Sequence, residues 1–261
     1  MLKLRIISAL VLAPLVIFIC WLGGWPFKIL LALAGGILAS EWLKMCACKL
    51  GQGVKEGLPL LAVVSASVAL VSWDLGFLAI VSGLILTLCL VKLRKIPGLY
   101  WLMGGMIYIT LPIMAMSWLR DKEQGEMIFL WLLLVVWATD TGAYFAGRLI
   151  GGPKLAPSIS PSKTWSGLTG GMLLAALVGI AMVSYNQGQS FVMLALFSAF
   201  LAVIAQTGDL LESKVKRYFG VKDSGNIIPG HGGLFDRVDG LLTAAPTVAL
   251  WLWLKGGETW L

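Results

Sequence analysis

Long apolar runs separated by short polar connections dominate the chain. A membrane-spanning helix needs about 20 mostly apolar residues, with roughly 17–25 tolerated. By this measure nine segments predict spanning helices, at 6–22, 27–43, 58–73, 75–91, 99–119, 127–147, 167–185, 190–210 and 238–254. No strand-like alternation of polar and apolar residues is visible between them. The pattern predicts an all-α, polytopic integral membrane protein with about nine transmembrane helices.

The composition agrees with this interpretation. The chain is 59% hydrophobic and 13% charged, whereas soluble domains are about 45–50% apolar and about 25% charged. The first apolar run follows Lys3 and Arg5, as in a signal peptide, but Gly23-Gly24-Trp25-Pro26 after it lacks an A-x-A cleavage motif. A retained first helix is therefore favoured over a cleaved signal.

The basic residues predict an orientation. If the N-terminus lies inside, 16 of the 20 lysines and arginines fall in cytoplasmic segments. The other four are Lys28, Arg120, Lys122 and Lys255. This bias predicts an N-in, C-out topology. The net charge of +7 then indicates anionic headgroups or phosphates as partners rather than nucleic acid, because the basic residues flank apolar runs.

Two cytoplasmic loops, 148–166 and 211–237, are longer than the others, and long loops often carry function. We therefore divide the chain into an N-terminal transmembrane region, 1–120, and a catalytic transmembrane region, 121–261. Because both loops face one compartment, they can meet over a single site.

The second loop combines basic residues, aspartates and a Pro-Gly-His-Gly-Gly turn whose amides can approach an anion. Asp236 and Asp239 share one face if the segment is helical. Asp209 follows the eighth apolar run, where a carboxylate is costly unless it is paired or binds a cation. Together they suit a magnesium–nucleotide site. The alternatives are a capping aspartate in a solvated loop and a solvated helix end.

Three other features are candidates for chemistry. Serines, a lysine and free amides near residue 164 can form an anion site at a helix start, or only a helix cap. Asp140, Tyr144 and Arg148 share a stripe of the sixth span, for function or for a structural Asp–Arg interaction. His231 caps the glycine turn or donates to a phosphate, whereas Glu41 is interpreted as an interfacial residue.

The stretch from Ser213 to Asp239 resembles the signature of phosphatidate cytidylyltransferases, also called CDP-diacylglycerol synthases. Ser158–Thr164 and Asp140–Arg148 are also similar to this family. The resemblance covers roughly residues 127–255, and the first 120 residues match only as an apolar helical region. The matching signature residues are Ser213, Lys216, Arg217, Lys222, Asp223, His231, Asp236, Arg237 and Asp239.

The resemblance implies a magnesium-dependent homodimer in the cell inner (cytoplasmic) membrane, with its active site facing the cytoplasm. It implies that CTP and phosphatidic acid give CDP-diacylglycerol and pyrophosphate. We expect Asp209, Asp236 and Asp239 to hold Mg²⁺, leaving open whether one or two cations bind. The expected catalytic cations are Lys216, Arg217, Lys222 and Arg237. The expected substrate-binding residues are Ser160, Ser162, Lys163, Thr164, Ser213, Asp223, His231, Asp140 and Tyr144.

Two rival functions remain open on the sequence. A CTP-dependent polyprenol or phytol kinase would phosphorylate a hydroxyl and would need a base near that nucleophile. A transporter would use Asp140 and Asp209 as coupling sites. No inverted repeat is visible, and all long loops lie on one side, which disfavours the transporter.

Overall fold

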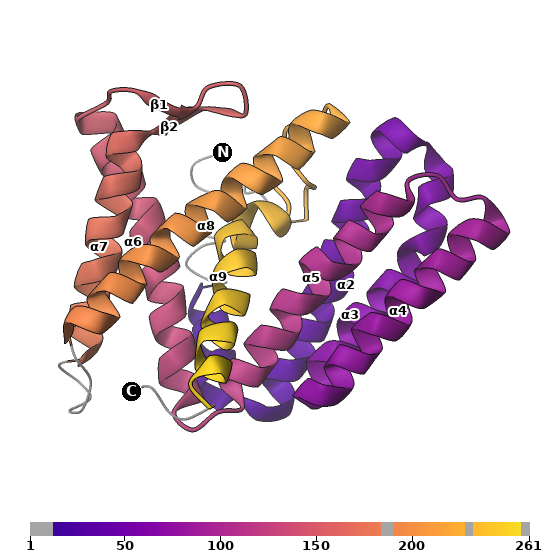
Figure 1. Ribbon diagram of the computed structural model, residues 1–261, viewed down its shortest axis with the longest axis horizontal. Helices are drawn as coiled ribbons and strands as arrows, with labels where there is room; N and C mark the ends of the chain where they lie inside the picture. Colours follow the sequence, from indigo (N-terminus) through magenta and orange to yellow (C-terminus); the bar gives the residue numbers. More distant parts are fainter. Residues whose placement is uncertain (1–12, 184–190, 228–231, 257–261) are drawn as a thin grey trace. The chain divides into compact units, whose positions relative to one another are not determined.

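The computed structural model describes residues 13–183, 191–227 and 232–256, and most of them are helical (Figure 1). Each predicted span coincides with a helix over its described residues, and residues 6–12 of the first predicted span lie outside the described part of the chain. The helices are Ala13–Leu22, α2 (Gly24–Leu50), α3 (Leu58–Leu70), α4 (Trp73–Arg94), α5 (Leu99–Arg120), α6 (Gly125–Leu149), α7 (Trp165–Val183), α8 (Phe191–Phe219) and α9 (Phe235–Leu254). A short 3₁₀ helix, η1 (Gln52–Gly57), leads into α3.

Within the described residues, seven helices are long and apolar enough to cross a bilayer, with η1 and α3 counted as one. The prediction of an all-α polytopic membrane protein is confirmed. Ala13–Leu22 is short in its described part, and α9 carries Asp236, Arg237 and Asp239 near its start. The exact number of spans and their orientation stay predictions.

The expectation that no strands interrupt the helices is wrong in the first long loop. Strands β1 (Lys154–Ala156) and β2 (Ser160–Thr164) pair antiparallel, with Lys154 opposite Thr164. Strands of three and five residues are too short for a period of two to stand out, since that signal needs about four to eight residues.

The second long loop is shorter than expected, because α8 continues to Phe219. Gly220 then ends the helix with φ of 72°. The Gly220 amide donates to the backbone carbonyl of Arg217, and the Val221 amide donates to that of Lys216. This is the hydrogen-bond pattern of a Schellman motif. Lys216 and Arg217 therefore lie on a helix, and the loop proper begins at Gly220.

The chain forms two compact units. The first comprises Met1–Asp121 and Val215–Val238, and the second comprises Lys122–Lys214 and Asp239–Leu261. In the first unit, α2, α3, α4 and α5 pack side by side (Figure 1). In the second, α6 packs along α7, and β2 contacts both helices.

Contacts at the two ends of the first unit agree with the predicted alternation of loops. At one end, the Lys49 ammonium lies 3.7 Å from the Tyr218 ring centre, so two predicted inside segments meet. At the other end, Lys28 pairs with Asp121 at 2.7 Å, and the Arg120 guanidinium donates to the Cys20 carbonyl. Predicted outside segments meet there.

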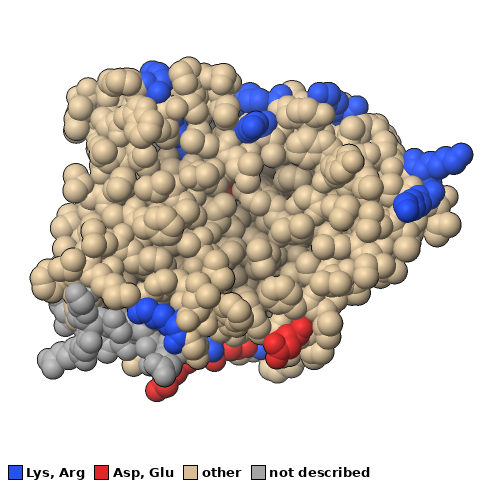
Figure 2. Space-filling view, viewed as in Figure 1, with Lys and Arg blue, Asp and Glu red and all other residues tan. Residues whose placement is uncertain are grey.

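The surface matches a bilayer environment. Leu78 of α4 is 64% exposed and Leu173 of α7 is 68% exposed, although both are large apolar residues. On the face drawn in Figure 2, uncharged side chains cover the flanks of the helices and the charged ones gather near helix ends. Lipid contact removes the cost of exposing such apolar flanks to water.

Candidate active site

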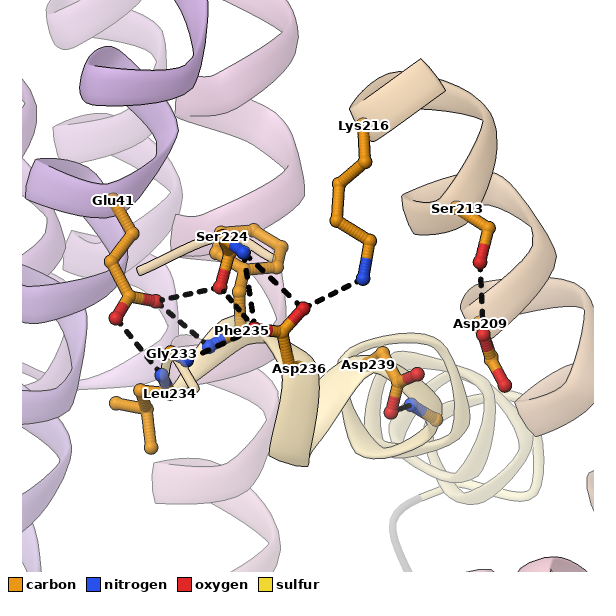
Figure 3. A network of polar contacts seen from close by, with 11 residues as sticks. Glu41, Asp209, Ser213, Lys216, Ser224, Gly233, Leu234, Phe235, Asp236 and Asp239 are labelled. Carbon is orange, nitrogen blue, oxygen red and sulfur yellow. Dashed lines mark hydrogen bonds and ion pairs between the residues drawn. The ribbon is translucent and has the colours of Figure 1, made fainter. Parts of the chain in front are cut away.

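In the first unit, the Asp236 carboxylate organises the loop that precedes α9 (Figure 3). It accepts from the Lys216 ammonium at 2.6 Å. It also accepts from the Ser224 hydroxyl at 3.0 Å, the Ser224 amide at 3.1 Å and the Gly233 amide at 3.0 Å. The bond to Gly233 runs back three residues, as in a capping box. Four donors thus use the acceptor capacity of this carboxylate.

The same contacts control the ionisation of Asp236, which precedes the predicted last span. Burial is the largest influence and by itself would raise the pKa. The Lys216 ammonium and the amides of Gly233 and Ser224 together outweigh burial, so the pKa of Asp236 lies below its usual value. The carboxylate is therefore ionised at neutral pH and is neutralised by Lys216.

Glu41 is the residue that sequence reasoning misjudged. It lies on α2 with no exposed surface, so the interfacial interpretation is wrong. Its carboxylate accepts from the amides of Leu234 and Phe235, each at 2.9 Å, and from the Ser224 hydroxyl at 3.3 Å. A carboxylate in an apolar helix is unfavourable unless it has a partner. The position of Glu41 within an apolar run is therefore the sequence feature that indicates a partnered carboxylate.

A second cluster lies in the second unit. The Lys163 ammonium on β2 pairs with Asp209 on α8 at 2.6 Å, and the Ser213 hydroxyl donates to the same aspartate at 3.3 Å. Asp239 on α9 lies within electrostatic range of Lys163, Asp209 and Asp140. Four elements thus bring four predicted site residues, Asp140, Asp209, Ser213 and Asp239, together with Lys163.

The donor chemistry of this cluster fits Mg²⁺, although its arrangement is not that of a formed metal site. Within the described part of the chain, no group of three or more Asp, Glu, His or Cys residues is placed to hold a metal ion. Asp209 and Asp239 offer the carboxylate oxygens that Mg²⁺ prefers, and Lys163 supplies positive charge in their midst. Asp236, by contrast, already has four donors.

The predicted anion site at the start of α7 is a cap in this structure. The Thr164 hydroxyl accepts from the Gly167 amide at 3.0 Å, and the Trp165 amide donates to the Pro153 carbonyl. These two amides are thus used internally. Ser160 and Ser162 lie on β2 with their hydroxyl oxygens 3.4 Å apart.

The predicted stripe on α6 holds in part: Arg148 donates to the Tyr144 hydroxyl at 2.6 Å. Asp140 lies on the same helix and is exposed. Four further predicted residues are also exposed, namely Arg217, Lys222, Asp223 and Arg237. His231 lies outside the described residues.

Comparison with known proteins identifies the family. Residues 3–255 match the model of the cytidylyltransferase family. The chain is 37% identical over 252 residues to the phosphatidate cytidylyltransferase of Brucella suis, covering 95% of this chain and 92% of that protein. It is 32% identical over 255 residues to the Bacillus subtilis phosphatidate cytidylyltransferase, covering 94% and 95%. A Rickettsia typhi phosphatidate cytidylyltransferase is 38% identical over 156 residues, 57% of this chain and 68% of that protein.

This polytopic membrane protein therefore belongs to the cytidylyltransferase family. The resemblance inferred from the stretch between Ser213 and Asp239 is confirmed, and the match extends to the first 120 residues, where the motifs alone indicated only apolar helices. The expected class, a nucleotidyltransferase, is likewise confirmed.

Proposed function

We propose that this protein transfers CMP from CTP to phosphatidic acid, giving CDP-diacylglycerol and pyrophosphate. The observation that carries the proposal is the match along nearly the whole chain to phosphatidate cytidylyltransferases. The lysine-centred carboxylate cluster in a membrane protein supports it. A phosphate oxygen of phosphatidic acid forms a bond to the α-phosphorus of CTP, and the bond from that phosphorus to the pyrophosphate oxygen breaks.

The residues suit this chemistry because the nucleophile is already an anion. No side chain has to remove a proton from it, so the obstacle is repulsion between two highly charged substrates. Catalysis of such a reaction depends on positioning and on positive charge near the phosphates. Lys163, with 14% of its side chain exposed, is the cation that we assign to substrate phosphate. The exposed Arg217, Lys222 and Arg237 are further candidates.

We assign Asp209 and Asp239 to Mg²⁺, which would neutralise phosphate charge when bound. Asp236 was also expected to be a ligand. Its carboxylate accepts from Lys216, from Gly233 and twice from Ser224, so we assign it to holding the loop in place. Lys216, paired with it, then serves the same task rather than binding phosphate.

We further propose that the protein is a homodimer of the cell inner (cytoplasmic) membrane, with its active site on the cytoplasmic side. The lipid tails of phosphatidic acid would stay in the bilayer while the headgroup reaches the polar ends of the helices. The concentration of Lys and Arg in the segments predicted to lie inside supports this orientation.

A labelling experiment tests the reaction and separates it from lipid phosphorylation. Purified protein is incubated with phosphatidic acid vesicles, Mg²⁺ and CTP labelled either at the α-phosphate or at the γ-phosphate. Transfer of CMP puts only the α-label into lipid and releases the γ-label as pyrophosphate. Lipid carrying the γ-label, with polyprenol or phytol as acceptor, would instead establish a kinase. No labelled lipid with either nucleotide would reject both enzymatic functions.

A further inference from the structure

The Glu41 carboxylate lies at the N-terminal end of α9, although the two residues it binds there are far away in the sequence. It accepts from the amides of Leu234 and Phe235 at 2.9 Å each. The first amides of a helix have no partner within the helix, and the helix dipole favours a negative charge beside them. Glu41 thus occupies, from a different helix, the position that a bound anion takes at a helix start.

The loop before α9 is built closely around this carboxylate. A Cβ atom on Gly225 would lie 2.7 Å from a Glu41 carboxylate oxygen, and a Cβ on Gly233 would lie 2.8 Å from either oxygen. The Ser224 hydroxyl sits between two carboxylates, 3.3 Å from Glu41 and 3.0 Å from Asp236. No side chain larger than glycine fits at either glycine without a shift of its neighbours.

Glu41 and Asp236 together bind four backbone amides in the described part of the loop before α9, and one of them, that of Gly233, belongs to the glycine turn that was expected to bind a phosphate. Asp236 binds the amides of Ser224 and Gly233, and Glu41 binds the next two along the chain. These four amides are therefore held by the protein's own carboxylates. This matters for the site because Asp236 and Asp239 lie three residues apart in the first turns of α9. A contact that holds the start of this helix therefore limits the movement of both residues.

We propose that Glu41 is a positioning residue for the CMP-transfer reaction, acting through the amides of Leu234 and Phe235 to set the start of α9. Ser224, Gly233, Leu234 and Phe235 then form a braced scaffold whose amides bind protein carboxylates rather than substrate phosphate. The expected effect on turnover rests on the proposed function. The contacts of Glu41 are observed in the structure and hold whatever the reaction is.

The test compares Glu41→Gln and Glu41→Asp with a matched control, Ser117→Ala. Ser117 is also buried in the first unit, with 3% of its surface exposed, and its hydroxyl links α5 to the Ala69 carbonyl of α3. Its loss weakens packing without touching the loop. Three quantities are measured in detergent or nanodiscs: thermal unfolding, hydrogen–deuterium exchange of the peptide spanning 224–239, and steady-state kinetics with CTP.

Gln keeps the size of Glu41 but replaces one acceptor oxygen with a donor, so one amide loses its partner. Exchange at Leu234 or Phe235 should rise at least about tenfold, because a bond to a charged group is lost. Turnover should fall at least about tenfold while the KM for CTP changes by less than about threefold, because misplacing catalytic groups lowers kcat. Glu41→Asp keeps both acceptor oxygens, so its turnover should stay above that of Glu41→Gln. Ser117→Ala should lower thermal stability without raising exchange at Leu234 or Phe235 and without lowering turnover per folded protein.

Wild-type exchange in Glu41→Gln, or a loss of activity that only follows the amount of folded protein as in Ser117→Ala, would overturn the proposal. If Glu41→Gln does not fold, Gly225→Ala is the second variant, because it displaces the Glu41 carboxylate without removing its charge. It should show the same increase in exchange and the same loss of turnover. Wild-type exchange together with wild-type turnover in Gly225→Ala would reject the proposal. A wild-type protein that makes no CDP-diacylglycerol would defeat the proposed function instead, and the exchange data would still decide whether Glu41 braces the helix.

Discussion

Lys163 on β2 and Asp209 on α8 form an ion pair with 2.6 Å between Nζ and Oδ2. The lysine side chain is 14% exposed and that of the aspartate 33%. Asp239 lies in electrostatic range of both. Carboxylates repel one another in a site with little water unless a cation lies among them. The single positive charge of Lys163 therefore reduces the repulsion between Asp209 and Asp239, a role that Mg²⁺ would fill with two charges.

A first prediction concerns competition between the two cations. Lys163→Met should lower turnover roughly tenfold or more, because phosphate loses a positive charge near it. The same change should decrease the half-saturating Mg²⁺ concentration severalfold, because Asp209 no longer pairs with an ammonium; unit charges about 4 Å apart interact by about 4 kcal/mol at an effective dielectric constant of about 20. Kinetics over a magnesium titration measure both effects. Lys154→Met, exposed on the neighbouring strand, is the control, and an increased magnesium requirement in Lys163→Met would contradict the assignment.

A second prediction separates the three aspartates. Asp209→Asn and Asp239→Asn should each lower turnover by about two decades or more, since about 1.4 kcal/mol is a factor of ten, with partial recovery at high Mg²⁺ or Mn²⁺. Asp236→Asn should lose stability and activity without such recovery, because its amide cannot accept from Lys216 and three further donors. Turnover against cation concentration and thermal unfolding provide the comparison. If Asp209→Asn and Asp239→Asn both retain wild-type turnover, neither aspartate holds the metal, because an aspartate that only caps loses tenths of a kcal/mol as asparagine.

The sequence predicts the helices well because each apolar run is a local signal. The spacing of Asp236 and Asp239, and of Tyr144 and Arg148, also follows from helical geometry once the runs are recognised. The contacts of Glu41 cannot be predicted from local sequence patterns. Its partners Leu234 and Phe235 are more than 190 residues away, at separations of 193 and 194, and no periodicity connects them.

The hairpin and the end of α8 cannot be predicted from hydropathy, for a different reason. Each depends on a few residues whose conformation is decided by short-range bonds. Gly220 closes α8 through the amides of Gly220 and Val221, and the antiparallel pairing of Lys154 with Thr164 is completed by Thr164 capping α7. Hydropathy over a window of about 19 residues averages these signals away.

A third prediction uses acid. Because Lys216 and two amides hold the pKa of Asp236 below its usual value, its contribution to stability is present above the unfolded pKa, about 3.9. It is lost as the pH falls through the folded pKa. The difference in Tm between wild type and Asp236→Asn should therefore be constant between about pH 5 and pH 7 and should narrow below about pH 4. Thermal unfolding of both proteins over this range measures it, and a difference that widens in acid would contradict the ion pair.

A fourth prediction concerns the packing of α6 on α7. A Cβ on Gly142 would lie 2.5 Å from the Gly170 carbonyl oxygen, and backbone atoms cannot move aside cheaply. Gly142→Ala should separate the helices and cost about 1–3 kcal/mol, as overpacking does. Gly36→Ala in α2 is the matched control, because nothing lies within 4 Å of its Cβ position, and alanine there should be neutral or slightly stabilising. Equal Tm shifts in the two variants would show that Gly142 is not a packing contact.

The last prediction tests orientation. With 16 of 20 basic residues in the segments assigned to the cytoplasm, the loop before α9 should lie inside and the turn between α5 and α6 outside. Ser224 is unsuitable as a probe because it is buried between Glu41 and Asp236, whereas Asn226 and Glu123 are exposed. After replacement of the four native cysteines, a membrane-impermeant maleimide should label Glu123→Cys in intact cells and Asn226→Cys only after permeabilisation. Asn226 belongs to the first compact unit and Glu123 to the second, and a protein inserted the other way round would exchange the two results. Labelling of Asn226→Cys from outside would therefore invert the topology and move the proposed active site to the opposite face of the membrane, where CTP is not supplied by the cytoplasm.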